Sequence, residues 1–236
     1  MYGFHGADYE KSIDDLFLSI KQEDGKLKYH REIGDDSIDK KLLNSDSKLI
    51  INPIEPLNLP KNITSNLLIE FDNPIIIPPK KKDKIYSTFP IEIGVFIKGS
   101  KDNSPLDIFS LSKSKYTLYG DIKTGSICKY WKSSSYDDIP DVDPIREGIL
   151  SLNLYNSYSD HVEIHKVVFS AYGMKIYYDE NAVSMVSKMI IKSENISETN
   201  FINSGIYKNM NKSLEIYEQR LSPQIKGERF IMEGGL

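Results

Sequence analysis

The sequence contains very little cysteine and has no long apolar run. Cys128 is the only cysteine among 236 residues, so the chain can form neither an internal disulfide nor a metal cluster built from several cysteines. Apolar runs such as Leu67–Ile69 and Ile75–Ile77 are far shorter than the roughly 20 residues that span a bilayer. Residues 1–11 lack the basic and apolar regions of an export signal. We therefore expect a cytoplasmic protein without a membrane span.

Arginine is also scarce, and the overall charge is slightly negative. The net charge is -4, the isoelectric point is near 5.7, and Arg31, Arg146, Arg220 and Arg229 are the only arginines. A chain with this charge has no general attraction for polyanions, so any such affinity would have to be local. The composition argues against nucleic acid as a partner.

What the sequence does contain is alternation of apolar and polar residues, interrupted by turn residues about every ten positions. Leu16–Lys21 and Leu27–Ile33 flank Glu23–Gly25, where Gly25 can take the positive φ of a tight turn. This pattern predicts a hairpin, with a helix as the alternative for Ile13–Ile20. Most gaps between strands are too short for helical crossovers, so we expect an all-β fold, mainly an antiparallel β-sandwich.

One segment near the C-terminus has helical spacing. Its apolar residues recur at steps of three and four until Pro223: Ile206, Met210, Leu214, Tyr217 and Leu221. We predict an antiparallel β domain with an N-terminal hairpin over residues 1–204. A C-terminal α-helix and a flexible tail, residues 205–236, would pack on it. Contact of the helix with another chain is the alternative.

The residue types between Lys113 and Tyr136 are typical of a contact surface. This window contains the only Trp, the only Cys, four tyrosines and five lysines, with Asp121 as its one acid. Aromatic faces stack on ligands, and lysines attract anions. The residues that we expect to bind a protein partner or an anionic small ligand are Lys123, Lys129, Tyr130, Trp131 and Lys132. A plain β-hairpin with core aromatics is the alternative.

His161, Glu163 and His165 alternate with Val162 and Ile164. On a strand, residues at i, i+2 and i+4 share one face, and imidazole and carboxylate groups can hold zinc or a similar divalent metal. Three ligands along one strand span about 13 Å, so a site would use two of them with partners from elsewhere. We expect this strand face to be solvated and the protein to have no cofactor. A divalent metal site such as a zinc site is the alternative.

Two groups of acidic residues are candidates for a chemical role. Glu55, Glu70 and Glu92 lie in or beside apolar strands, where burial would suit a general acid or base. Alternation with Ile69 and Ile91 favours solvent-facing or edge positions for Glu70 and Glu92, and the prolines around Glu55 favour an edge. Four aspartates follow the Lys113–Tyr136 window, namely Asp137, Asp138, Asp141 and Asp143. Prolines interrupt them, which favours a solvated loop over a calcium site.

Four blocks along the chain resemble one family. They are Asn52–Pro56, Phe89–Phe96, Lys115–Gly120 and Gly173–Asp179. In this order they are similar to an archaeal family of methanogens, domain of unknown function 432. The resemblance covers most of the chain and implies an archaeal source, but no activity, substrate or catalytic residue.

The sequence therefore favours a non-catalytic cytoplasmic binding or scaffolding module. One alternative is a metal-dependent or carbohydrate-active enzyme that uses His161, Glu163 or His165. Another is a structural subunit that forms a homo-oligomer through the apolar face of the predicted C-terminal helix or through an unpaired edge strand.

Overall fold

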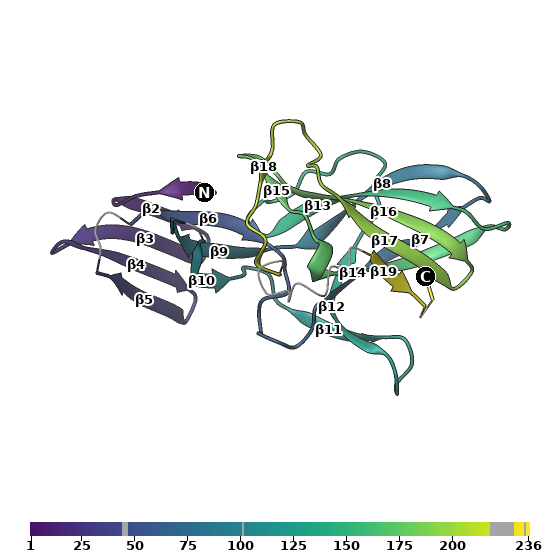
Figure 1. The fold of residues 1–236 in the computed structure, drawn as a ribbon, viewed down its shortest axis with the longest axis horizontal. Coiled ribbons are helices and arrows are strands. Elements are labelled where there is room, and N and C mark those ends of the chain that lie inside the picture. The colour runs from purple at the N-terminus through teal and green to yellow at the C-terminus, as the bar shows by residue number, and fades with distance from the viewer. Residues whose placement is uncertain (44–46, 101, 218–228, 234) are drawn as a thin grey trace. The chain divides into compact units, whose positions relative to one another are not determined.

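The computed structural model describes residues 1–43, 47–100, 102–217, 229–233 and 235–236 (Figure 1). They form strands β1–β19 and one short 3-10 helix, η1, over Ala171–Gly173, and Ile216 and Tyr217 also have helical conformation. The expected all-β fold is confirmed. The residues group into two compact units, one of Met1–Asn52 with Ile93–Leu111 and one of Pro53–Glu92 with Ser112–Leu236. Whether they act as the single β domain expected over residues 1–204 stays a prediction.

The first unit is built from two four-stranded sheets. One has the order β1-β6-β9-β10, and the other has the order β2-β3-β4-β5. The strands are β1 Gly3–His5, β2 Tyr9–Ile13, β3 Leu16–Glu23, β4 Lys26–Ile33, β5 Asp36–Leu42, β6 Leu49–Ile54, β9 Glu92–Ile97 and β10 Ser104–Phe109.

The predicted hairpin joins β3 to β4. Glu23 pairs with Lys26, and Asp24 and Gly25 between them have φ values of 51° and 69°. Two successive positive φ angles match the twist of the flanking strands, which is why Asp-Gly is favoured in such turns. The hairpin prediction is confirmed, and the helical alternative for Ile13–Ile20 is wrong.

Arg31 of β4 is buried in the first unit. Its Nε donates to Asp107 Oδ2 at 2.8 Å, and its Nη1 donates to Asp36 Oδ2 at 2.8 Å. The Tyr29 hydroxyl donates to the same Asp107 oxygen at 2.8 Å, and the guanidinium lies 5.2 Å from the centre of the Phe109 ring. A charge can be buried when it is paired and hydrogen-bonded, so this cluster ties β4 to β10 across the two sheets.

The second unit also contains two sheets. One has the order β11-β12-β7-β14; the other has the order β18-β15-β16-β13-β8, with β17 on β16 and β19 on β17. Their strands are β7 Asn66–Ile77, β8 Lys82–Pro90, β11 Lys115–Tyr119, β12 Ser126–Ser133, β13 Glu147–Asn156, β14 Val162–Ser170, β15 Tyr177–Tyr178, β16 Val183–Ser193, β17 Ile196–Ile202, β18 Asn211–Lys212 and β19 Arg229–Met232.

Pairing in the second unit is mostly antiparallel, with two parallel pairs, β12 with β7 and β13 with β16. Side chains connect the two sheets: the rings of Phe169 and Phe201 lie 5.2 Å apart, and Thr199 Oγ1 donates to the Val168 carbonyl at 3.1 Å. Phe169 is fully buried, and a buried aromatic side chain of this size contributes roughly 1.5–3 kcal/mol.

The prediction of a C-terminal helix from Ile206 onwards is not supported. Residues 206–215 form bends, turns, irregular backbone and strand β18. Only Ile216 and Tyr217 are helical, and Leu221 and Pro223 lie outside the described residues. Met210 has the apolar character that suggested a helix, but it packs in a cluster with Tyr86 of β8, Ile149 of β13 and Ala182, which directly precedes β16. Spacing alone could not separate a helix from a loop whose apolar residues reach the same core.

The expected flexible tail also needs correction in part. Strand β19 pairs with β17, with Met232 opposite Ser197. Met232 is buried, and its sulfur accepts the Val168 N–H at 3.4 Å. Residues 229–232 are therefore part of the sheet.

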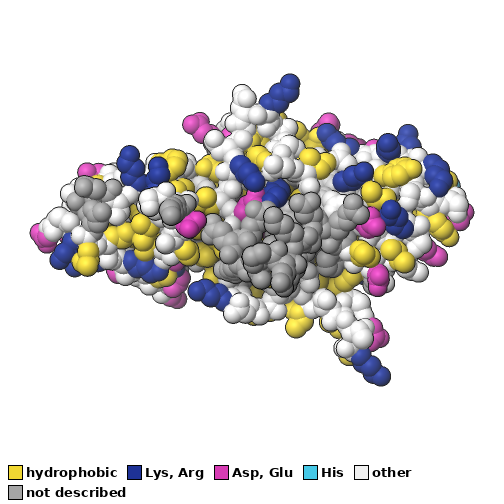
Figure 2. Space-filling model, in the orientation of Figure 1, with side chains coloured by type: hydrophobic (Ala, Val, Ile, Leu, Met, Phe, Trp, Pro, Cys, Tyr) yellow, Lys and Arg dark blue, Asp and Glu magenta, His cyan; other side chains and the backbone are white. Residues whose placement is uncertain are grey.

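The described residues contain no helix that is long and apolar enough to cross a membrane. On the face shown in Figure 2, basic and acidic side chains are interspersed.

Candidate functional site

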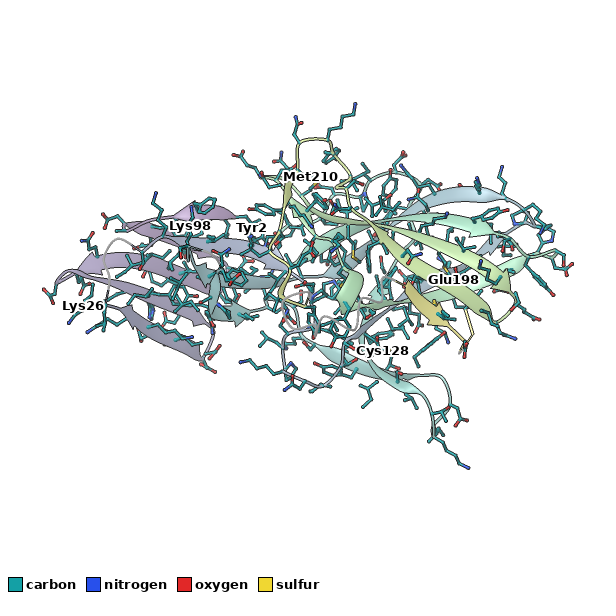
Figure 3. The ribbon with its side chains drawn as sticks, viewed as in Figure 1. Tyr2, Lys26, Lys98, Cys128, Glu198 and Met210 are labelled. Carbon is teal, nitrogen blue, oxygen red and sulfur yellow. The ribbon has the colours of Figure 1, made fainter. Side chains whose placement is uncertain are left out.

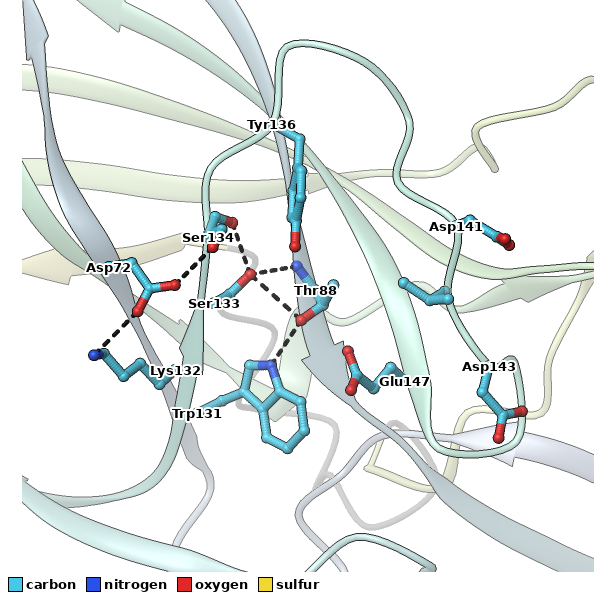
Figure 4. Close-up of a pocket in the computed structure, with 11 residues that line it drawn as sticks. Asp72, Thr88, Trp131, Lys132, Ser133, Ser134, Tyr136, Asp141, Asp143 and Glu147 are labelled. Atoms are coloured by element: carbon cyan, nitrogen blue, oxygen red, sulfur yellow. Dashed lines mark hydrogen bonds and ion pairs between the residues drawn. The ribbon is translucent and has the colours of Figure 1, made fainter.

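A cavity of about 410 Å³ opens beside Trp131 in the second unit (Figure 4). We call it the Trp131 cavity. Strands β7, β8, β12 and β13 and the loop between β12 and β13 contribute to it. It is lined by Asp72, Thr88, Trp131, Lys132, Ser133, Ser134, Tyr136, Asp141, Val142, Asp143 and Glu147.

The loop over the cavity is fixed to strand β8. Tyr86 and Tyr136 exchange two backbone hydrogen bonds of 2.8 Å each, as an isolated antiparallel bridge. This bridge satisfies the backbone of residue 136, which would otherwise lie in a loop without a ladder partner. It thereby holds the Tyr136 ring at the cavity.

Trp131 is partly exposed and is held by hydrogen bonds. Its Nε1 donates to Thr88 Oγ1 at 3.0 Å. Thr88 is itself placed by Ser133, whose Oγ accepts the Thr88 N–H at 2.8 Å and the Thr88 hydroxyl at 3.3 Å. The polar edge of the indole is thus satisfied inside the protein, as tryptophan usually requires, and its orientation is fixed without a ligand.

Asp72 and Lys132 form an exposed pair at the cavity, with 3.0 Å between Lys132 Nζ and Asp72 Oδ1. Ser134 donates to Asp72 Oδ2 at 2.6 Å. The Ser134 hydroxyl and the Lys132 ammonium lower the pKa of Asp72, and Asp72 raises the pKa of Lys132. Both residues are charged at neutral pH and have a partner within the protein.

Three further acids line the cavity, and they differ in how they are bonded. Asp143 Oδ1 accepts the Ile145 N–H at 3.1 Å, and its Oδ2 lies 3.4 Å from Arg146 Nε. Throughout the part of the chain that the structure describes, the carboxylates of Asp141 and Glu147 have no ion-pair or hydrogen-bond partner. These two groups are the acceptors that a ligand could use.

Strand β12 divides the five predicted contact residues between two faces. Lys129 and Trp131 lie on one face and Tyr130 and Lys132 on the other, because successive side chains of a strand alternate. The Tyr130 hydroxyl bonds to Glu70, and burial, followed by this carboxylate, raises the pKa of Tyr130. Lys123 is exposed in the turn after β11. The five residues therefore do not form one surface, and only Trp131 and Lys132 line the cavity.

Lys129 is buried. Its Nζ lies 2.8 Å from Glu92 Oε1, and Glu92 also accepts the backbone N–H groups of Asn58 at 2.9 Å and Leu59 at 3.2 Å. Burial raises the pKa of Glu92, while Lys129 acts in the opposite direction. This pair holds the segment after β6 in place, so Lys129 has a structural role. The expected solvent-facing position of Glu92 is wrong.

Glu55 is likewise buried, contrary to expectation. Its Oε1 accepts the Ile216 N–H at 3.1 Å, and the Tyr217 hydroxyl donates to the Leu57 carbonyl close by. Burial raises the pKa of Glu55 to about 7. The carboxyl connects two distant parts of the second unit, and the apolar residues around it in the sequence were the signal for its burial.

The predicted alternation around His161 matches the structure. Val162 and Ile164 are buried, and His161, Glu163 and His165 are exposed. His165 Nε2 lies 3.3 Å from Glu163 Oε1. Among the residues that the structure describes, no three His, Cys, Asp or Glu side chains converge in an arrangement that could hold a metal ion. The metal site stays a prediction.

Cys128 is buried on β12 (Figure 3). Burial raises the pKa of its thiol to about 11, so it stays protonated at neutral pH, whereas a reactive cysteine needs a thiolate. Cys128 is therefore a small apolar residue of the core.

Sequence reasoning missed Thr88 and Glu147 as cavity residues. Asp141 and Asp143 were noticed, but they were expected to be a solvated loop. Their position in the sequence was the available signal. They follow the Lys113–Tyr136 window directly, so a short loop can place them beside the strand that carries Trp131. No pattern connects Thr88 with Trp131, because 43 positions separate them.

Comparison with known proteins gives a family for the chain. No curated protein and no solved structure matches it significantly. The model of one family matches residues 1–233, and this covers all of the blocks that suggested the resemblance. The chain belongs to the family described as protein of unknown function, DUF432.

Proposed function

We propose that this protein is a non-catalytic, cytoplasmic binding module of archaeal origin, and that the Trp131 cavity holds a small ligand. The observation that carries the proposal is the partly exposed Trp131 indole in the cavity wall, with its N–H already bonded to Thr88. An aromatic ring in a fixed orientation offers a large contact area at little entropic cost.

The size and lining of the cavity support this proposal. Its volume of about 410 Å³ lies within the range of roughly 300–1,000 Å³ that is typical of small-molecule sites. Two aromatic rings, Trp131 and Tyr136, face a lining that is otherwise mainly polar. Such a lining suits a polar ligand with an apolar surface for the rings.

The charge of the cavity favours a ligand other than an anion. The lysines of the Lys113–Tyr136 window led to the expectation of a protein partner or an anionic ligand. Lys132 is the one basic residue among the described lining residues, and four acids, Asp72, Asp141, Asp143 and Glu147, accompany it. Anionic ligands would meet net repulsion here.

The proposal is tested with a chemically diverse set of small molecules and the fluorescence of Trp131. This residue is the only tryptophan, so its emission reports on the cavity. Ligands should bind the Tyr136→Ala variant at least about tenfold more weakly, the loss of one good contact. Tyr207→Ala, an exposed tyrosine outside the cavity lining, is the matched control and should bind as the wild type does.

Two results would contradict the proposal. One is a set of ligands that bind Tyr136→Ala and the wild type equally. The other is a set in which no molecule changes the emission of Trp131 or raises the melting temperature. Lys129→Ala is not a suitable test of binding, because removing a partner of a buried ion pair lowers stability.

A further inference from the structure

We infer that the ligand of the Trp131 cavity is a small organic cation that carries amine groups. This inference rests on the proposed binding function and adds the chemical class of the ligand. It follows from the cavity groups that already have partners, from those that do not, and from the two rings.

Most hydrogen-bonding groups of the cavity are already used within the protein. Trp131 Nε1 is bonded to Thr88, and Ser133 bonds both Thr88 and the Ser134 carbonyl. Asp72 is occupied by Ser134 and Lys132. These bonds hold the groups in place, and the charge of Asp72 is already compensated by Lys132, so they shape the cavity more than they recognise its contents.

The two carboxylates that remain can only accept hydrogen bonds. They are Asp141 and Glu147, which have no partner among the described residues. An ionised carboxylate has about four lone-pair positions and no proton to donate. The ligand must therefore supply donors, and both ammonium and hydroxyl groups could do so.

Charge distinguishes these two kinds of donor. A ligand that enters the cavity displaces water from both carboxylates, and this is costly unless their charge is compensated. A hydroxyl group donates a hydrogen bond but leaves the negative charge in place. An ammonium group donates hydrogen bonds and also compensates the negative charge, and such charge-assisted bonds are about twice as strong as neutral ones.

The aromatic residues add to the same preference. Trp131 and Tyr136 both line the cavity, and the face of an aromatic ring is attractive to a cation and strongest for tryptophan. Because the Trp131 N–H points to Thr88, its edge is not available as a donor for an anion. Aromatic faces beside free carboxylates are the usual surroundings of bound organic cations.

The experiment uses probes that match in length and differ only in their end groups. 1,4-Diaminobutane, 1,4-butanediol and succinate are titrated into the full chain, and Trp131 emission and calorimetry are recorded. Diamines of three and five carbons and tetramethylammonium cover other sizes. We expect at least one of the cations to bind at least about tenfold more tightly than the diol and the diacid.

The variants Glu147→Gln and Asp141→Asn keep the shape of each side chain and remove its charge. Each should weaken the binding of the cation about tenfold. Asp138→Asn removes a charge from the same loop at an exposed residue that does not line the cavity. It should change the affinity less than about twofold, since its attraction is screened.

The outcomes separate the two proposals. If the diol or another neutral molecule binds and is lost in Tyr136→Ala, while the cations do not bind, the binding function stands and the cation inference is overturned. Equal weakening by Asp138→Asn and Glu147→Gln would also overturn it, because this would show general charge attraction. If no probe of any charge binds, both proposals fail.

Discussion

Lys129 and Glu92 form an ion pair in the interior of the second unit, with their side chains 4% and 0% exposed and 2.8 Å between Nζ and Oε1. Lys132, three residues along the same strand, pairs with Asp72 at 3.0 Å, and those side chains are 57% and 39% exposed. The two pairs have similar geometry in different surroundings.

Burial should make the first pair far more important for stability. We expect Lys129→Met to lower the free energy of unfolding by about 3–5 kcal/mol, because it leaves the Glu92 carboxylate buried without its cation. Lys132→Met should change it far less, because solvent screens this exposed pair. Urea unfolding followed by Trp131 emission measures both, and equal losses would show that Lys129 is not buried as described.

Glu55 should make stability depend on pH. Its pKa is about 7 in the folded protein and 4.5 ordinarily, so the folded state holds this proton more tightly. The stabilisation is complete below pH 4.5, falls by about 1.4 kcal/mol per pH unit as the pH rises towards 7, and is lost above 7. The wild type should thus lose about 3 kcal/mol over this window relative to Glu55→Gln. Unfolding curves of both proteins from pH 4 to 8 that run parallel would exclude this role.

Thr88 should control the mobility of the Trp131 ring. Thr88→Val keeps the shape of the side chain but removes the acceptor of the indole N–H, at a cost of about 1 kcal/mol. We expect acrylamide to quench Trp131 emission more strongly in this variant. Thr117→Val, on neighbouring strand β11, is the control and should leave the quenching unchanged. If the two variants behave alike, the hydrogen bond does not hold the ring.

The purified protein should contain much less than one zinc ion per chain. His165 and Glu163 contact each other on an exposed strand face, and a two-residue site of this kind lacks the three or four ligands that zinc normally takes. Metal analysis before and after addition of zinc measures this. A stoichiometric metal that is lost in both His161→Ala and His165→Ala would instead establish the predicted metal site.

Local patterns predicted local structure well. The Asp24-Gly25 turn and the alternation of Val162 and Ile164 with their polar neighbours both follow from backbone sterics and the two-residue period of a strand. The helix expected from Ile206 and Met210 failed because their burial comes from contact with residues far away in the sequence, which the spacing could not reveal. Glu55 and Glu92 were misplaced for the same reason.

The candidate site was predictable only in part. The sequence indicated Trp131 and Lys132, but it placed all four residues from Lys129 to Lys132 on one surface, although alternation on β12 sends Lys129 and Trp131 to one face and Tyr130 and Lys132 to the other. Thr88, Asp72 and Glu147 join the cavity from three other strands, and each is positioned by strand pairing over long separations.

The sequence by itself determined the all-β class, the hairpin turn and the absence of disulfides, because these depend on the covalent chain and on residues within a few positions of one another. Only the tertiary structure decided that Lys129 is a buried counterion and that Trp131 belongs to a cavity with free carboxylates. Burial and charge compensation depend on which strands become neighbours, and that depends on the packing of the whole unit.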